Sequence, residues 1–132
     1  VHGEGLHGGG GVDELSITGP SRVVSVRGTH SDELEEFTIT PADFGFEPAH
    51  TPERLLGGDA RANAARIVAI LSDQETGAAL DMILLNAAAA LHVAGMTSSL
   101  PEAAHLAKES ISTGRALRSL ELLKEASVAA TL

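Results

Sequence analysis

The pattern of polar and apolar positions changes along the chain, and its first part predicts two short strands. Residues 21–27 are rich in β-branched side chains, which favour extended backbone. Residues 36–40 follow a polar connection, and their apolar side chains alternate with polar ones. Together the two segments predict a β-hairpin with a long turn. Because two strands alone make a marginal sheet, we expect further strands from a region before residue 1.

From residue 59 onward, apolar residues recur at helical spacing. Asp59 is a suitable N-cap for a first helix, and the apolar residues that follow it at this spacing are Ala60, Ala64, Ile67, Val68 and Leu71. A second helix is predicted from about Ala79 to His92. It is apolar nearly all round, so we expect it to be central and buried. A third begins at residues 99–102, a capping-box pattern with proline in the first turn, and continues to Leu123 with Gly114 as a weak point.

Two further segments are predicted to be irregular. Residues 1–11 carry glycine at six positions, and so many residues without Cβ disfavour regular structure. Residues 41–52 contain three of the five prolines. The resulting order is a loop, two strands and about three helices.

Composition restricts the possible functions. The 132 residues make about one domain, with 43% hydrophobic and 20% charged residues, as in globular proteins. The formal net charge of −9 argues against a nucleic-acid or anionic-membrane surface, since both require clustered Lys and Arg. A phosphorylated small molecule is compatible with this charge if a metal ion supplies the positive charge.

The chain has no cysteine, which excludes a disulfide scaffold and a thiolate zinc site and is compatible with the cytoplasm. The longest apolar stretch, residues 78–96, contains three polar residues and is therefore expected to be a buried helix rather than a membrane span. No signal-peptide pattern is visible at Val1, and we expect the sequence to begin inside a larger polypeptide.

Several familiar motifs are better explained without chemistry. Residues 3–8 match G-x-G-x-x-G, but three more glycines follow where a dinucleotide-binding helix would begin, so we expect a loop. His7-Gly8-Gly9-Gly10 resembles the oxyanion-hole stretch of some esterases, but the chain has no G-x-S-x-G nucleophile motif, which such an enzyme requires. Asp43-Phe44-Gly45 matches the magnesium motif of kinases, but the chain is much too short for a kinase. We interpret these residues as a strand end followed by a turn glycine. The six histidines show no zinc-binding spacing, and His92 is expected to be a satisfied core residue.

The adjacent acids Asp13 and Glu14 are the strongest candidates for chemistry. They follow the glycine-rich loop and precede the apolar residues of a short segment, so they could lie at a strand-to-loop rim. Adjacent acids are most often solvated surface residues. Two hard oxygen donors at such a rim would nevertheless suit magnesium, which prefers one or two carboxylates together with water and substrate phosphates.

Several short segments occur in a characteristic order over nearly all of the chain. Residues 1–6 and 12–16 resemble the V-H-G-x-x-G-L-D-E-L-S stretch of anthranilate phosphoribosyltransferases. Further segments that resemble this family are Pro41-Ala42-Asp43-Phe44-Gly45, Gly57-Gly58-Asp59-Ala60 with Asn63-Ala64, Leu84-Leu85-Asn86-Ala87-Ala88 and Ser112-Thr113-Gly114-Arg115-Ala116-Leu117.

The resemblance implies a magnesium-dependent enzyme of tryptophan biosynthesis that joins anthranilate to the phosphoribosyl group of phosphoribosyl pyrophosphate. It assigns magnesium binding to Asp13 and Glu14 and no substrate role to Asp59, Asn63 or Asn86. Asp59 is expected to cap a helix, and Asn86 to be a buried amide bonded to neighbouring backbone. The resemblance also implies a cytoplasmic homodimer, with residues 1–132 as part of the C-terminal α/β domain of the nucleoside phosphorylase/phosphoribosyltransferase fold.

The chain departs from the family in two respects. Residues 7–12 intervene between Gly-Leu and Asp-Glu, which bears on the geometry of the acidic pair rather than its identity. The Gly-Thr-Gly-Gly-Asp pyrophosphate loop, the Lys-His-Gly-Asn segment, the anthranilate-binding arginine and the N-terminal helical region used for dimerisation are absent. We therefore expect a C-terminal fragment of the catalytic domain that is inactive alone.

Two other functions remain open at this point. A pyrimidine-nucleoside phosphorylase, which resembles this family in fold, would use free phosphate and a nucleoside. A non-catalytic paralogue could bind nucleic acid, although the acidic charge counts against this.

Overall fold

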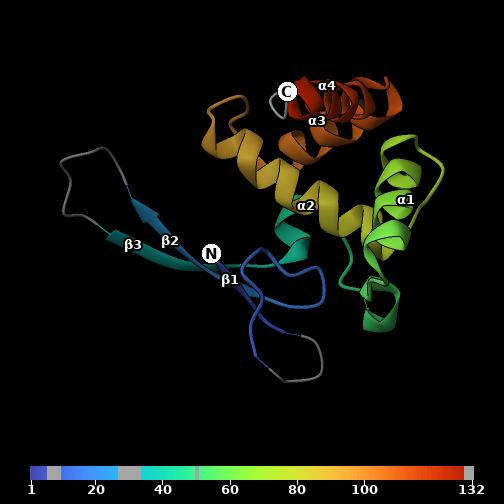
Figure 1. The fold of residues 1–132 in the computed structure, drawn as a ribbon. Helices are drawn as coiled ribbons and strands as arrows, with labels where there is room; N and C mark the ends of the chain where they lie inside the picture. The colour runs from blue at the N-terminus through green and yellow to red at the C-terminus, as the bar shows by residue number, and fades with distance from the viewer. Residues whose placement is uncertain (6–9, 27–33, 50, 130–132) are drawn as a thin grey trace.

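A computed structural model describes residues 1–5, 10–26, 34–49 and 51–129 of the chain. In these ranges, a three-stranded antiparallel sheet lies beside four α-helices, so the α/β class is confirmed (Figure 1). The elements are β1 (His2–Gly3), β2 (Ser21–Val26), β3 (Leu34–Ile39), the 3-10 helices η2 (Pro41–Phe44) and η3 (Pro52–Leu55), α1 (Ala60–Leu71), α2 (Ala78–Val93), α3 (Leu100–Ser112) and α4 (Arg115–Ala129).

The predicted hairpin forms two strands of the sheet, with β2 in the centre and β3 at one edge. β2 pairs with β3 in a register that places Val23 opposite Phe37, and residues 27–33 of the expected turn lie outside the described residues. The third strand, β1, pairs His2 with Arg22 and comes from the glycine-rich opening, for which a loop was predicted. That prediction was wrong for residues 2–3 because backbone pairing over two residues needs no pattern of side chains.

The N-cap of α1 is confirmed, but its predicted apolar face is not. The Asp59 carboxylate accepts a hydrogen bond from the backbone N–H of Ala62 at 2.8 Å. Ile70 is the buried residue of α1, whereas Ile67 and Val68 are exposed. Helical spacing predicted the helix correctly, but the position of neighbouring elements decided which face is covered.

Helix α2 is central, as its apolar sequence predicted. It packs along α3, where Ala88 and Ala103 are both fully buried, so the two helices approach closely through small side chains. One core cluster joins α2 and α3 to the segment before β2 through Leu15 and Ile17. A second cluster joins the two helices to α1 through Ile70. The chain between β1 and β2 is thereby fixed against α2.

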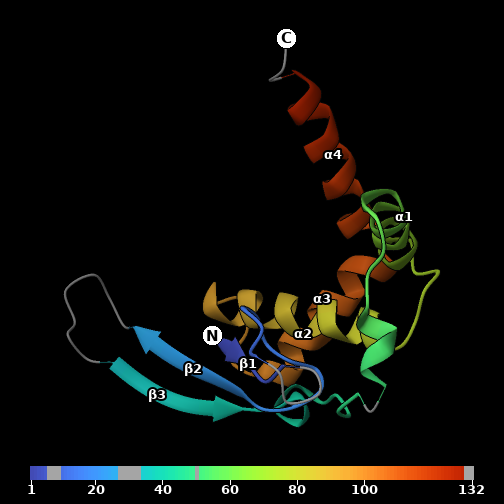
Figure 2. The ribbon, with the colours of Figure 1, turned by 60° about the horizontal axis from the view of Figure 1, so that its bottom comes forward.

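The expected third helix is divided at its predicted weak point. The backbone of Gly114 has φ +76°, a left-handed conformation that glycine adopts without a Cβ penalty, and α3 ends just before it. Helix α4 then projects away from the other helices and has no buried residue (Figure 2). None of the helices in the described part of the chain has the length and hydropathy of a membrane span.

Candidate functional site

The acidic pair lies in the segment between β1 and β2, and this segment is anchored on both sides. On the N-terminal side, Val12 and Gly3 exchange two backbone hydrogen bonds, each 3.0 Å long. Val12, the last residue of the intervening stretch, is therefore tied to β1, whereas residues 7–9 lie outside the described part of the chain. The acids begin at the residue that directly follows this bridge.

On the C-terminal side, the anchor is the Asn86 side chain of α2. The backbone N–H of Leu15 donates to Asn86 Oδ1 at 2.9 Å, and Asn86 Nδ2 donates to the Leu15 carbonyl at 3.0 Å. Asn86 Nδ2 also donates to the carbonyl of Met82 at 3.1 Å. The prediction that the Asn86 amide bonds to backbone is confirmed, but the residue is half-buried rather than buried as expected.

Two further contacts fix the segment beyond Leu15. The backbone N–H of Ser16 donates to the buried Ser21 hydroxyl at 2.9 Å, and the N–H of Ala49 donates to the Ile17 carbonyl at 2.8 Å. Leu15 and Ile17 are almost fully buried. The backbone that carries the acidic pair is therefore held by both hydrogen bonds and apolar contacts.

Asp13 and Glu14 are both exposed at this position. In the described ranges, no group of three or more His, Cys, Asp or Glu side chains is arranged to hold a metal ion. The donor set is thus two hard carboxylates open to solvent. Such a set fits magnesium, which takes few protein ligands and completes its octahedron with water and substrate phosphates. It does not fit a closed structural zinc site.

A hollow of about 520 Å³ lies beside Glu14, between this segment and helices α1 and α2. Its polar wall includes Glu4, Asn63 and Arg66 as well as Glu14. Apolar side chains complete it, among them Ile67, Ile70, Met82 and Ile83. A hollow that combines an apolar surface with a few charged groups is typical of small-molecule sites.

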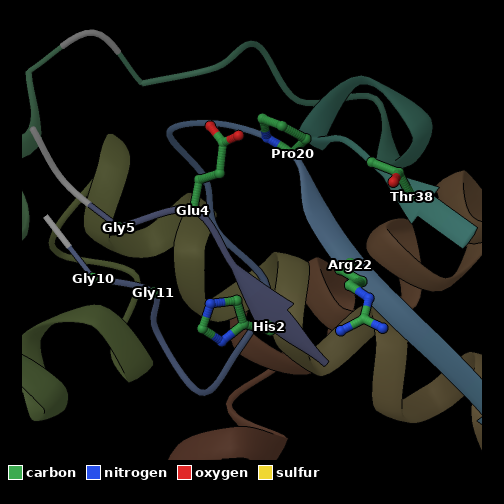
Figure 3. A pocket seen from close by; sticks show the side chains of 8 residues that line it. All are labelled: His2, Glu4, Gly5, Gly10, Gly11, Pro20, Arg22 and Thr38. Atoms are coloured by element: carbon green, nitrogen blue, oxygen red, sulfur yellow. The ribbon is translucent and has the colours of Figure 1, made fainter. Parts of the chain in front are cut away.

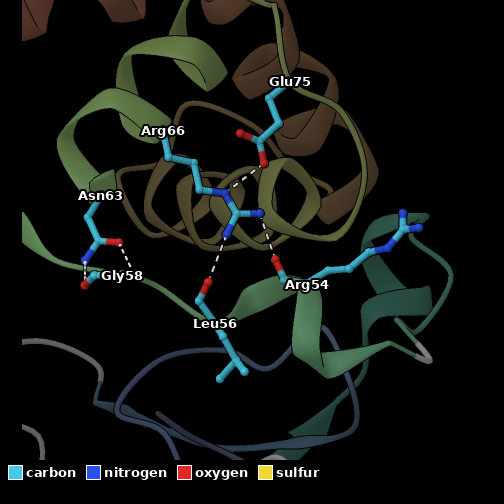
Figure 4. Close-up of polar contacts among 6 residues, drawn as sticks. All are labelled: Arg54, Leu56, Gly58, Asn63, Arg66 and Glu75. Atoms are coloured by element: carbon cyan, nitrogen blue, oxygen red, sulfur yellow. Dashed lines mark hydrogen bonds and ion pairs between the residues drawn. The ribbon is translucent and has the colours of Figure 1, made fainter. Parts of the chain in front are cut away.

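Arg66 connects three segments at the edge of this hollow (Figure 4). Its guanidinium donates to the Glu75 carboxylate at 2.8 Å, to the carbonyl of Arg54 at 2.7 Å and to the carbonyl of Leu56 at 3.3 Å. Sequence reasoning did not identify this residue. Its position three residues after Asn63 and four before Ile70 places it on the inner face of α1, which could have indicated it.

Asn63 closes the turn that precedes α1 (Figure 4). Its amide accepts a hydrogen bond from Gly58 N–H at 2.7 Å and donates to the Gly58 carbonyl at 3.0 Å. A Cβ at Gly57 would come within 2.8 Å of Asn63 Oδ1. The Gly57-Gly58-Asp59 sequence therefore builds a compact helix start beside the hollow.

A second hollow of about 560 Å³ is also lined by Glu4 (Figure 3). His2 and Arg22 line it together with backbone of the glycine-rich opening at Gly5, Gly10 and Gly11. Arg22 hydrogen bonds to Glu36 across β2 and β3, and this bond lowers the pKa of the Glu36 carboxyl. Residues 6–9, which include half of the G-x-G-x-x-G match, lie outside the described residues.

Two other sequence interpretations can be compared with the structure. Asp43 and Phe44 belong to η2 rather than to a strand end, although Gly45 is the expected turn glycine with φ +86°. His92 was expected to be a satisfied core residue. Its Nδ1 atom is instead buried without a hydrogen-bond partner among the described residues, so that expectation was wrong for this nitrogen.

Residues 3–117 match the model of a family described as the glycosyl transferase family, a/b domain. The anthranilate phosphoribosyltransferase of Rubrobacter xylanophilus is 46% identical over 116 residues, covering 88% of this chain and 33% of that protein. The enzyme of the same name from Roseiflexus castenholzii is 44% identical, covering 89% of this chain and 34% of its own length. The chain thus spans about a third of the length of the curated relatives it matches.

Solved structures give the same result for the fold. An anthranilate phosphoribosyltransferase from Thermus thermophilus superposes with a TM-score of 0.72 at 36% identity, covering 84% of this chain and 31% of that one. The Saccharomyces cerevisiae enzyme in complex with 4-fluoroanthranilate gives a TM-score of 0.68 at 30% identity, covering 84% of this chain and 31% of that one. A variant of the yeast enzyme solved with Mg bound also gives 0.68, at 29% identity and with the same coverage.

Proposed function

The chain belongs to the glycosyl transferase family through its α/β domain, and from this membership we propose that the full-length protein is an anthranilate phosphoribosyltransferase. Its reaction would transfer the phosphoribosyl group of phosphoribosyl pyrophosphate to anthranilate, as a step of tryptophan biosynthesis. The observation that carries the proposal is the similarity to enzymes of this name over nearly the whole chain, at 42–46% identity.

In this reaction, the anthranilate nitrogen forms a bond to C1 of the ribose while the bond from C1 to pyrophosphate breaks. The amine loses a proton, and negative charge develops on the leaving pyrophosphate. Magnesium, when bound, would neutralise that charge as a Lewis acid and orient the leaving group. Asp13 and Glu14 would hold it as ligands and would not carry protons. Their exposure and the anchored backbone on either side support this role.

The hollow beside Glu14 supports a substrate site on this side of the domain. Its size and mixed polar and apolar lining suit part of a small, charged, aromatic or sugar-containing molecule. The yeast relative solved with 4-fluoroanthranilate supports anthranilate as the acceptor, and the variant solved with Mg supports magnesium as the cofactor. Phosphoribosyl pyrophosphate and anthranilate are therefore the partners we propose.

The proposal extends to the assembly and location of the protein. We expect the full-length protein to be a homodimer in the cytoplasm that associates through a region N-terminal to this domain. The absence of cysteine from the sequence is compatible with that compartment. Neither nucleic acid nor a membrane is expected as a partner, because the net charge of −9 opposes both.

The test is an assay of the full-length protein with anthranilate, phosphoribosyl pyrophosphate and magnesium. We expect release of pyrophosphate that requires all three components and stops when EDTA is added. Phosphorolysis of a pyrimidine nucleoside without activity on anthranilate would instead assign the protein to the phosphorylases. If the protein catalyses neither reaction but binds nucleic acid in a gel shift at moderate salt, it is a nucleic-acid-binding protein and not an enzyme.

A further inference from the structure

We propose that Asn86 is a positioning residue that fixes the direction of the Asp13–Glu14 pair from helix α2. This inference rests on the proposed function, because it assumes that the two acids hold magnesium. The hydrogen bonds that the structure describes for Asn86 go to backbone atoms and not to the two carboxylates. It acts through the backbone of Leu15, to which it makes two hydrogen bonds of 2.9 and 3.0 Å.

The peptide units on both sides of Leu15 are held by these bonds. The N–H that donates to Asn86 belongs to the peptide between Glu14 and Leu15, so the bond restricts rotation about the Glu14 backbone. The carbonyl that accepts from Asn86 belongs to the next peptide, whose N–H donates to the Ser21 hydroxyl. With the bridge between Val12 and Gly3, only two residues lie between fixed points. Those two residues are the acids.

The chemistry of the contact requires an amide. One partner on Leu15 is a donor and the other an acceptor, and Asn presents one group of each kind on a short side chain. The bond from Nδ2 to the Met82 carbonyl at 3.1 Å fixes which end of the amide faces which partner. An ionised aspartate has nearly the same shape and could accept a hydrogen bond from the Leu15 N–H. Its second carboxylate oxygen, however, would repel the Leu15 carbonyl oxygen, which is also negatively polarised.

The apolar contacts of Leu15 serve a different purpose from the amide. The Leu15 side chain is 2% exposed in a cluster with Leu85 and Ala88, so its burial also helps to keep the segment on the helix. Burial is non-directional and does not set the orientation of the backbone. Outer residues that orient metal ligands typically change metal affinity by about 10–100-fold when replaced. We therefore expect Asn86 to influence metal binding more than folding.

The experiment compares the wild-type full-length protein with Asn86→Asp and, as a milder change, Asn86→Gln, which retains both groups on a longer side chain. Calorimetric titration with phosphoribosyl pyrophosphate at several magnesium concentrations measures binding without turnover. Hydrogen exchange measures protection of the Leu15 amide in the metal-free protein. For Asn86→Asp we expect magnesium-dependent binding at least about tenfold weaker, with faster exchange in residues 12–18. Asn86→Gln should show a smaller loss of the same kind.

Ile111→Val is the matched control. This residue is buried in the other core cluster, whose members include no residue of the acidic segment, so its shortening should lower the stability of the protein slightly. We expect its magnesium dependence to be unchanged. Wild-type-like magnesium dependence in both Asn86 variants, at whatever stability, would overturn the positioning role. A folded wild-type protein that does not bind phosphoribosyl pyrophosphate would instead reject the proposed function. In that case, the hydrogen-exchange result would still show whether Asn86 fixes the backbone of residues 12–18.

Discussion

Gly3 of β1 lies directly against the backbone of Glu14. A Cβ atom at Gly3 would come within 2.6 Å of the Glu14 carbonyl oxygen and within 2.8 Å of the Ser16 nitrogen. Both neighbours are backbone atoms, in a segment that hydrogen bonds hold in place. Glycine at this position is therefore explained by close approach, and the strand that supports the acidic segment tolerates no side chain there.

Gly3→Ala is expected to destabilise the full-length protein by about 1–3 kcal/mol, because the added methyl must displace a fixed backbone. Denaturant unfolding measures this loss. Gly19→Ala is the control, since its Cβ would meet the Glu4 carboxylate at 2.9 Å, the mobile end of an exposed side chain. Equal losses for the two variants would show that Gly3 has no special steric role.

Arg66→Lys is expected to reduce the free energy of unfolding by about 1–2 kcal/mol, because one ammonium cannot replace a guanidinium that reaches Glu75 and two carbonyls. Arg118→Lys on the exposed helix α4 is the matched change, where an i,i+3 pair with Glu121 should matter by less than about 0.5 kcal/mol. Chemical denaturation of both variants tests the difference. If Arg66→Lys is as mild as the control, the three-segment connection contributes little to stability.

The local features of this fold were predictable from sequence because they depend on neighbours in the chain. Asp59 and Ser99 cap α1 and α3, with their side chains accepting from residues three positions later. Asn86 was predicted to bond to backbone because a polar residue in an apolar helix needs a partner. Its partner, Leu15, is 71 residues away, and nothing local in the sequence identifies that distance.

Features that depend on packing were predicted less well. The choice of Ile70 over Ile67 as the buried residue of α1 is decided by the elements that cover the helix. Strand β1 exists because β2 offers an edge to which two residues can pair. For the site, the sequence singled out Asp13 and Glu14, whereas Arg66 was indicated only by its helical spacing from Asn63 and Ile70 and its place at the hollow beside Glu14 depends on packing.

Asp81 should make stability depend on pH in a defined direction. Burial in the first turn of α2 raises the pKa of this carboxyl, and the charge of Lys108 opposes the shift only in part. The native state therefore binds more protons than the unfolded chain in the window between the unfolded and folded pKa, so this group adds stability as the pH falls through its raised pKa. As the pH is lowered from 7 to about 4, the free energy of unfolding of the wild-type protein should rise relative to that of the Asp81→Asn variant.

Paired unfolding curves of the two proteins at each pH measure this difference and cancel the contributions of other groups. A constant difference across the range would mean that the Asp81 carboxyl titrates alike in both states. A difference that moves in favour of the Asn variant at low pH would reverse the assigned effect of burial.

Gly114 should control the separation of α3 from α4. Gly114 has φ +76°, and a Cβ disfavours this left-handed conformation. Gly114→Ala is therefore expected to lower the free energy of unfolding by about 1–2 kcal/mol. Gly114→Asn should cost less, since Asn tolerates this conformation better than Ala. Thermal unfolding ranks the three proteins. Higher stability with alanine would indicate that the chain prefers one continuous helix here.

The central claim, that Asp13 and Glu14 hold magnesium for phosphoribosyl pyrophosphate, is tested most directly by a magnesium titration of the full-length protein carrying Asp13→Asn and Glu14→Gln. At the magnesium concentration that saturates the wild-type protein, we predict that the affinity of the double variant for phosphoribosyl pyrophosphate is lower by at least about tenfold. Higher magnesium should recover this affinity only in part. Glu47→Gln, an exposed acid outside the segment, should titrate like the wild type. A double variant whose magnesium curve and substrate affinity match those of the wild type would contradict the account.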